Sequence, residues 1–130
     1  MDLNHADGLL LSSLTLSYKG QAISIDKLVI DTGASHSLIS VDVVSDIGVY
    51  FENTDEIVNA FGIGGEALCF RKTFDTVQLG TFQIQNFKLD VGLLHQKLDI
   101  NGLIGLNLLM QADMILDLSQ LAMYPASIKS

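Results

Sequence analysis

One carboxylate in this chain is placed where it could do chemistry. The apolar run Leu-Val-Ile at residues 28–30 leads directly to Asp31, and a turn of small residues, Thr-Gly-Ala-Ser at 32–35, follows it. An Asp that ends an apolar strand costs free energy unless its carboxylate is hydrogen-bonded or has a chemical role. The small residues would let the backbone come close to whatever the carboxylate acts on. The alternative interpretation is an Asp that begins an ordinary turn.

Two later stretches are also marked by glycine. The first, Phe-Gly-Ile-Gly-Gly at residues 61–65, lies between two short apolar segments and predicts the tip of a hairpin. A phosphate-binding loop is disfavoured there because no Lys-Ser or Lys-Thr pair and no helical pattern follow, whereas a hairpin loop without a ligand stays open. The second stretch, Gly-Leu-Ile-Gly-Leu-Asn-Leu-Leu at 102–109, predicts a buried strand followed by a short helix.

Short strands must position these residues. Apolar alternation with turn signals roughly every 8 to 12 residues predicts a closed or sandwiched all-β domain of about seven to nine strands. The expected strands are residues 14–18, 22–30, 57–61, 67–71, 74–79, 82–91, 114–118 and 121–124, and residues 98–104 form an apolar segment interrupted by a turn. Short helices are expected over 41–47, with Ser40 as N-cap and Gly48 as the stop, and over 106–111.

In this order, the three glycine-marked stretches resemble the retropepsin-like aspartic proteases, the family of retroviral proteases and their single-domain cellular and bacterial relatives. The family pattern is an apolar strand ending in Asp-Thr-Gly, a β-hairpin flap with a glycine-rich tip, and a late apolar-apolar-Gly followed by a short helix. The resemblance covers residues 14–118. It implies an all-β, retropepsin-like closed β-barrel or sandwich with a flap hairpin and one or two short helices, and residues 1–130 as a single domain. The segment 40–59 is longer than in the retroviral pattern.

The resemblance also implies a homodimer. One carboxylate cannot activate a water and protonate a leaving amine at once, whereas two close carboxylates can, because repulsion keeps one of them protonated. The chain has a single Asp-Thr-Gly, since Asp-Thr-Val at 75–77 and Asp-Leu-Ser at 117–119 lack the glycine. Asp31 of one subunit would therefore meet Asp31 of its partner across a two-fold axis. The terminal segments 9–16 and 114–124 are the expected dimer sheet, because both are short, apolar and otherwise leave an edge exposed.

The resemblance assigns roles around Asp31, the expected catalytic residue. Thr32 would hydrogen-bond across the dimer beneath the acids, and the amide of Gly33 would help to hold the carboxylate. Ser35 would either add a hydrogen bond to Asp31 or be an ordinary turn serine. Gly105 would permit a close backbone approach beneath the active loop.

Substrate contacts are expected from two places. The flap-tip glycines Gly64 and Gly65 would allow the hairpin to close over a bound peptide and exclude water. Ile63, Leu103 and Ile104 are expected to line pockets for the side chains of the substrate. An extended substrate would pair its backbone with strand edges.

The function implied by the resemblance is that of an aspartic endopeptidase, a hydrolase that cleaves peptide bonds with a water activated between two Asp31 carboxyls. No cofactor is needed, and no metal site is expected because His5, His36 and His95 have no ligand spacing. Two other functions stay open on the same fold, a non-catalytic peptide-binding module and a dimerisation module.

Composition excludes several partners. The formal net charge of −8 argues against nucleic acid and against an anionic membrane surface, since both require clustered Lys and Arg. No apolar run approaches the roughly 18 residues that a membrane-spanning helix needs, and residues 1–11 lack the pattern of a signal peptide. Cys69 is the only cysteine, so no disulfide can form within one chain and a cytoplasmic location is expected.

Overall fold

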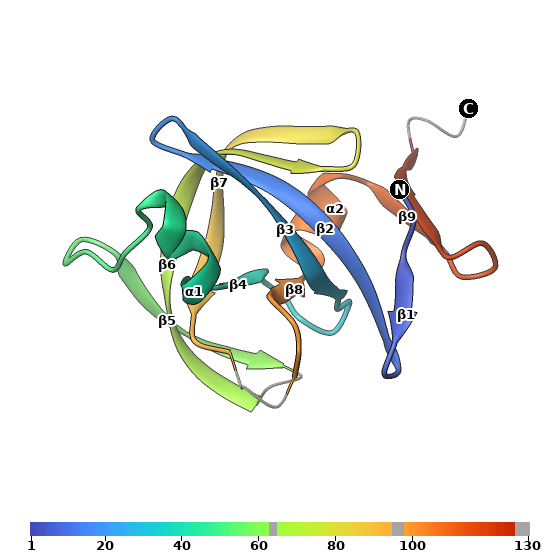
Figure 1. The fold of residues 1–130 in the computed structure, drawn as a ribbon, viewed down its shortest axis with the longest axis horizontal. Coiled ribbons are helices and arrows are strands. Elements are labelled where there is room, and N and C mark those ends of the chain that lie inside the picture. Colours follow the sequence, from blue (N-terminus) through green and yellow to red (C-terminus); the bar gives the residue numbers. More distant parts are fainter. Residues whose placement is uncertain (63–64, 95–97, 127–130) are drawn as a thin grey trace.

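The computed structural model describes residues 1–62, 65–94 and 98–126 and consists mainly of strands (Figure 1). In chain order the elements are β1 (Asn4–Ala6), β2 (Leu9–Tyr18), β3 (Gln21–Ile30), β4 (Leu38–Ser40), α1 (Val41–Val44), the 3-10 turn η1 (Ser45–Ile47), β5 (Glu56–Gly62), β6 (Gly65–Leu79), β7 (Phe82–Gly92), β8 (Gly102–Ile104), α2 (Leu106–Gln111), β9 (Met114–Asp117) and β10 (Ala122–Pro125). The predicted all-β fold class is confirmed. None of the helices within the described residues is both long and apolar enough to span a bilayer.

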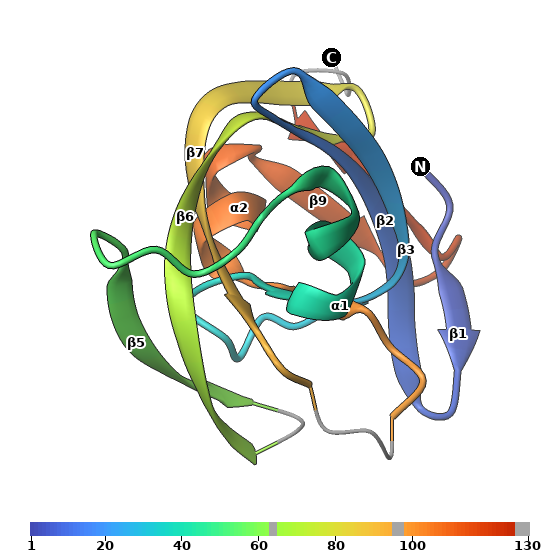
Figure 2. The same ribbon diagram turned by 60° about the vertical axis from the view of Figure 1, so that its left-hand side comes forward.

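Most of the described strands belong to one sheet that closes on itself. Its strand order is β1-β2-β3-β8-β4-β7-β6-β5, and an additional pairing joins β2 to β6. The ring therefore runs from β2 through β3, β8, β4 and β7 to β6, with β1 and β5 attached outside it. Figures 1 and 2 show the β5–β6 hairpin reaching out from this ring, with β9 beside α2 on another side. β9 and β10 form a separate two-stranded sheet.

The pairing of β8 brings distant parts of the chain together at the end of β3. β8 runs parallel to β3, with Val29 opposite Leu103 and Ile30 opposite Ile104. On its other side β8 pairs with β4, where Leu38 lies opposite Leu103. Because β3 and β8 end at the same level, the chain leaves the sheet at Asp31 and at Gly105 side by side.

Two clusters of buried apolar side chains stabilise this arrangement. The larger one fills the ring and is centred on fully buried side chains such as Leu16, Phe74 and Ile104. The smaller cluster lies on the opposite face of β8 and β4 and consists of Val29, Ala34, Leu38, Cys69 and Leu103. Alternation along each strand explains the division, since neighbouring residues point to opposite faces. Through Ala34, the smaller cluster contacts the loop that carries Asp31.

The return strand of the hairpin differs from the sequence prediction. Segments 67–71 and 74–79 were expected to be two strands, but they form the single strand β6. The polar residues between them do not break the strand because β7 pairs with the far side of β6 on both sides of them, from Cys69 to Leu79. Only the partner on the near edge changes. This edge pairs with β5 as far as Arg71 and with β2 from Thr76 onward.

Two other expectations need correction. The helix expected over 41–47 is one α-helical turn followed by a 3-10 turn, and Ser40 makes no side-chain cap, although Gly48 ends the segment with a φ of 84°. The segment 9–16 is not a free edge for a dimer sheet. It forms β2, which is paired with β1 and β6 on one side and with β3 on the other, and its apolar side chains Leu14 and Leu16 belong to the main core.

Candidate active site

Two hydrogen bonds to the backbone hold Asp31, one through its own N–H and one through its carboxylate. Its N–H donates to the carbonyl of Ile104 at 2.9 Å, which continues the β3–β8 pairing by one residue. Its carboxylate oxygen Oδ1 accepts the N–H of Gly33 at 3.0 Å. The residue is half-buried, whereas Thr32 and Gly33 are exposed. The backbone therefore fixes the carboxylate in orientation while leaving it open to solvent on one side.

The turn after Asp31 is joined to the start of α2. Ala34 N–H donates to the Asp31 carbonyl at 3.2 Å and closes the turn. The carbonyls of Ala34 and Ser35 then accept the N–H groups of Leu106 and Asn107, at 2.8 and 3.1 Å. The first N–H groups of a helix have no partner within the helix, and α2 has no side-chain cap. The carbonyls of the Asp31 loop take the place of that cap.

Gly105 is where the backbone comes closest to this loop. A Cβ atom at position 105 would lie 2.5 Å from the carbonyl oxygen of His36 and 2.8 Å from that of Ala34. The φ of Gly105 is −98°, which any residue can adopt, so close approach and not backbone strain requires the glycine. By contrast, a Cβ at Gly33 would meet only the movable Asp31 carboxylate, at 3.3 Å.

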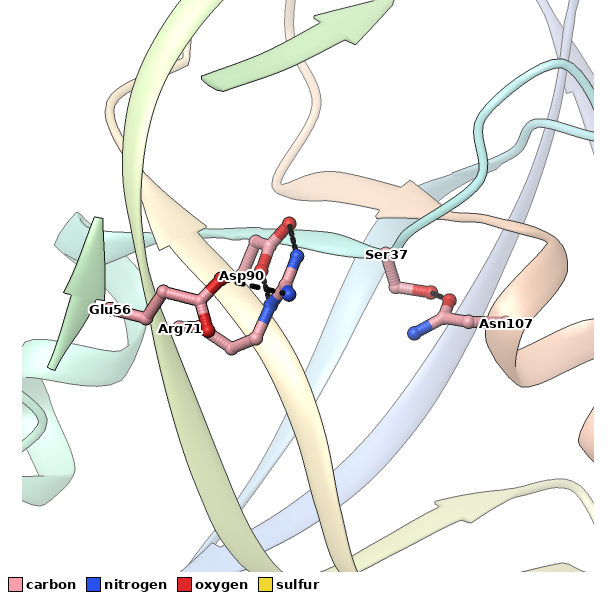
Figure 3. A network of polar contacts seen from close by, with 5 residues as sticks. All are labelled: Ser37, Glu56, Arg71, Asp90 and Asn107. Atoms are coloured by element: carbon pink, nitrogen blue, oxygen red, sulfur yellow. Dashed lines mark hydrogen bonds and ion pairs between the residues drawn. The ribbon is translucent and has the colours of Figure 1, made fainter. Parts of the chain in front are cut away.

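A buried serine that sequence reasoning missed connects these parts. The Ser37 hydroxyl accepts the N–H of Gly105 at 2.9 Å and donates to Asn107 Oδ1 at 2.8 Å (Figure 3). The carbonyl of Ser37 accepts the N–H of Asp90 on β7 at 3.0 Å. Ser37 is fully buried and its bond with the Gly105 N–H is made away from water, whereas Asn107 is half-buried. The available signal was a serine directly before the apolar segment 38–39 and an Asn within an otherwise apolar helix.

The remaining predicted residues around Asp31 have mixed positions. Within the described residues, no hydrogen bond joins the Ser35 side chain to Asp31, and Ser35 is exposed. Leu103 belongs to the small apolar cluster beside Ala34. Ile104 is fully buried in the main core, so its side chain is not available to a substrate as expected. Adjacent residues of β8 point to opposite faces, and only one of the two can face the Asp31 side.

The expected flap tip is only partly described. Ile63 and Gly64 lie outside the described residues. Gly65 begins β6 and pairs with Gly62 at the end of β5. The hairpin itself is present, with seven cross-strand pairs between β5 and β6.

The base of the hairpin carries an ion network that the sequence did not predict. Glu56, Arg71 and Asp90 lie opposite one another on β5, β6 and β7 (Figure 3). Arg71 Nε donates to Asp90 Oδ1 at 2.8 Å, and Nη1 lies 3.4 Å from Glu56 Oε2. The pKa of Arg71 is raised by its hydrogen bonds to Asp90. The charge of buried Asp90 is thereby compensated.

Thr32 borders an apolar cavity between the Asp31 loop, α2 and β9. The volume of this cavity is about 460 Å³. The lining residues are Ile30, Thr32, Leu106, Leu109, Met110, Asp113, Met114, Ile115, Leu116, Met123 and Ala126. Met110, one of the lining residues, is 69% exposed. Among the described residues, no group of three or more His, Cys, Asp or Glu side chains is arranged to hold a metal ion.

Comparisons with known proteins agree with this geometry. A family model described as aspartyl protease matches residues 14–108. No curated protein sequence matches the chain. Among solved structures, the chain is similar to a retropepsin-like aspartic protease from Rickettsia conorii, with 22% sequence identity and a TM-score of 0.63 over 89% of this chain and 82% of that chain. Because the family match spans most of the chain and includes Asp31, the β5–β6 hairpin and Gly105, the chain belongs to the aspartyl protease family and has a retropepsin-like fold.

Proposed function

We propose that this protein is an aspartic endopeptidase that acts as a homodimer with one Asp31 from each subunit. The observation that carries the proposal is the setting of Asp31. Its carboxylate is fixed by the Gly33 N–H, open to solvent on one side, and located in the single Asp-Thr-Gly of the sequence. Within the described residues, no cation is paired with it, so a second carboxylate can set its protonation.

The chemistry follows from bringing two such carboxyls together. Repulsion between them leaves one ionised and the other protonated at working pH, and the pair titrates as a unit. The ionised carboxylate takes a proton from a water molecule as the water oxygen bonds to the carbonyl carbon of the peptide. The protonated carboxyl donates its proton to the carbonyl oxygen. When the C–N bond breaks, the carboxyl that took the water proton gives it to the leaving nitrogen, and the other carboxylate takes a proton from a hydroxyl of the intermediate, which restores the pair.

The apolar cavity beside Thr32 supports the dimer. An occupant of this cavity contacts Thr32 and therefore lies next to Asp31. A second copy seated there about a two-fold axis would bury the exposed Met110 and bring its own Asp31 close. The site of the single chain has only half of the required carboxyl pair, so its activity depends on this contact.

The hairpin supports an extended peptide as substrate. β5 is the last strand of the sheet order, so its outer edge has no strand partner among the described residues. A peptide can pair its backbone with such an edge. We propose that the substrate lies between the hairpin and the Asp31 loop, with the small cluster around Leu103 beneath its side chains.

The test is cleavage of a mixed peptide library by the wild type and by Asp31→Asn. A matched control is Asp75→Asn, because Asp75 begins the other Asp-Thr pair in an exposed part of β6 and, within the described part of the chain, accepts a hydrogen bond only from Gly20. We expect cuts that vanish with Asp31→Asn and persist with Asp75→Asn. Peptide binding without cleavage by either the wild type or the control would instead indicate the non-catalytic binding module. Cuts that survive in Asp31→Asn would contradict the assignment of the catalytic residue.

A further inference from the structure

The positive charges of this acidic chain are concentrated around one cavity. The sequence has seven Lys and Arg residues against fifteen Asp and Glu. Four of the seven, Lys19, Arg71, Lys72 and Lys88, line a cavity of about 430 Å³. It is separate from the Asp31 loop, since neither Asp31 nor any other residue of that loop lines it.

The sheet leaves room for this cavity at one edge of β6. β5 pairs with this edge as far as Arg71, and β2 pairs with it from Thr76 onward. Residues 72–75 therefore have no strand partner on that edge. The lining residues come from both sides of the gap: Tyr18 and Lys19 at the end of β2, the turn before β5, and the adjoining parts of β6 and β7.

Lys72 is the buried charge of the cavity. Its side chain is only 5% exposed, and Nζ lies 2.6 Å from Glu52 Oε1 and 2.8 Å from Asp55 Oδ2. Burial acts to lower the pKa of Lys72, but hydrogen bonds to Asp55 and Glu52 outweigh it and leave the pKa above its ordinary value. Lys72 is therefore an ammonium at neutral pH. The ring of Tyr18 lies 5.9 Å from Nζ and covers another side of it.

The two carboxylates on Lys72 differ in how firmly they are held. Asp55 is 11% exposed, and its Oδ2 also accepts the backbone N–H of Glu52 at 2.8 Å. Glu52 is 55% exposed, and among the described residues its carboxylate contacts only Lys72. A long, exposed side chain loses little when its single ion pair is replaced by another anion. Glu52 thus occupies a position on Lys72 that an external carboxylate or phosphate can take.

Two further cations, Lys19 and Lys88, line the same cavity. Lys19 lies with its Nζ 5.3 Å from the Tyr18 ring, and its charge acts on Glu52, where it helps to lower the pKa of that carboxyl. Lys88 is exposed on β7 opposite Thr73, and within the described residues no ion pair involves it. Both therefore have positive charge available for a ligand. Arg71 is already paired with Asp90 and Glu56, so it would attract an anion only through its positive electrostatic potential.

We propose that this cavity binds a small, multiply charged anion bearing phosphate or carboxylate groups, with one group replacing Glu52 on Lys72 and the others paired with Lys19 and Lys88. The volume suits a small molecule and not a folded partner. Binding at this site is independent of the proposed peptidase activity.

The test is an NMR titration of the full chain with inorganic phosphate and, separately, with citrate at constant ionic strength. We expect amide shifts confined to the cavity residues. Glu52→Gln removes the competing carboxylate and leaves Asp55 on Lys72, so it should tighten binding by about three- to tenfold. Lys88→Gln should weaken binding by about threefold or more. Tighter binding of phosphate identifies a phosphate-bearing ligand, and tighter binding of citrate identifies a polycarboxylate.

Matched controls separate a local site from the overall charge. Glu66→Gln changes the net charge as Glu52→Gln does, and Lys27→Gln matches Lys88→Gln, but neither residue lines the cavity. Both controls should leave binding unchanged. Equal effects of a variant and its control, or amide shifts spread over the surface, would overturn the proposal. Absence of any shift with both anions would also overturn it.

Discussion

Two polar networks in this molecule are linked by the hydrogen bond from the Asp90 N–H to the Ser37 carbonyl, and they differ in kind. The network of Ser37, Asn107 and Gly105 is neutral and consists of hydrogen bonds that join a buried hydroxyl to a half-buried amide and to the backbone. Figure 3 shows the bond between Ser37 and Asn107. The network of Glu56, Arg71 and Asp90 is ionic and runs from buried Asp90 to exposed Glu56. The first joins the Asp31 loop to α2, and the second joins the base of the hairpin to β7.

The two networks contain different kinds of group, so solution conditions affect them differently. None of the groups in the neutral network titrates near neutral pH, so the position of Asp31 stays the same while its own protonation changes. The Arg71–Glu56 pair at the hairpin base is weakened by salt, because the exposed charge of Glu56 is screened by ions in solution. The part that positions the Asp31 carboxylate therefore contains no charged group, whereas the part that supports the base of the hairpin depends on charges.

Among substitutions in the neutral network, Gly105→Ala is expected to destabilise the protein most. The new Cβ would lie 2.5 Å from a backbone carbonyl oxygen that cannot move alone, so we expect a loss of about 3 kcal/mol or more in unfolding free energy. Gly33→Ala is the matched control, because its Cβ would meet only the Asp31 carboxylate. This second variant should keep its stability and lose cleavage. Chemical denaturation together with a peptide-cleavage assay measures both, and equal stability of the two variants would contradict the account.

Among substitutions in the network of Glu56, Arg71 and Asp90, Arg71→Met is expected to have the largest effect. The change leaves the buried carboxylate of Asp90 without its cation, which typically costs about 3 kcal/mol. Arg71→Met with Asp90→Asn removes both charges and should restore most of the loss. Urea denaturation of the single and double variants measures the coupling. A double variant no more stable than the single one would show that the pair is not what stabilises the base of the hairpin.

Ser37→Ala tests the neutral network more gently. It leaves the buried Gly105 N–H without its partner and removes one partner of the half-buried Asn107 amide, at a cost of about 2 kcal/mol. Because no charge is lost, the decrease in melting temperature should be the same at every pH from 4 to 8. A decrease that varies with pH over that range would indicate that the network is linked to a titrating group.

The smallest expected effect is the pH dependence of the Lys72 contacts. A hydrogen bond from Lys72 lowers the pKa of Glu52, and for Asp55 the same donor and the Glu52 N–H outweigh the effect of burial, which acts to raise its pKa. Folded-state pKa values below the unfolded values of about 4 give stability that is complete above that pH and is lost as the pH falls through the folded values. The melting temperature of Lys72→Met should therefore depend less steeply on pH between 3 and 5. Parallel curves for wild type and variant would contradict this.

The local sequence pattern was sufficient to predict those parts of the site whose structure is determined by residues close together in the chain. Asp31 at the end of an apolar strand and the helix after Gly105 follow from composition and periodicity, and α2 has the bounds expected. Ser37 could not be predicted in the same way, because its partners lie 68 and 70 residues away along the chain. Ile104 was misplaced because a short apolar strand does not reveal which of its two faces belongs to the core.

The same reason explains the errors in the strands. β6 was divided at its charged residues because the sequence does not show that Lys72 is buried against Glu52 and Asp55. Segment 9–16 looked like a free edge because its pairing with β6, unlike its local hairpins with β1 and β3, depends on the closure of the ring. Pairings between distant strands are determined by the whole fold, and local propensity contains little information about them.

The central claim, that two copies of Asp31 form one catalytic site, is tested most directly by mixing wild type with Asp31→Asn. Total protein is held constant at a concentration where subunits exchange, and peptide cleavage is measured as the wild-type fraction decreases. With equal parts of each, the account predicts about one quarter of the original activity, because only pairs with two intact Asp31 residues are active. Activity that falls only in proportion to the wild-type fraction, to about one half, would mean that each chain acts alone and would contradict the shared site.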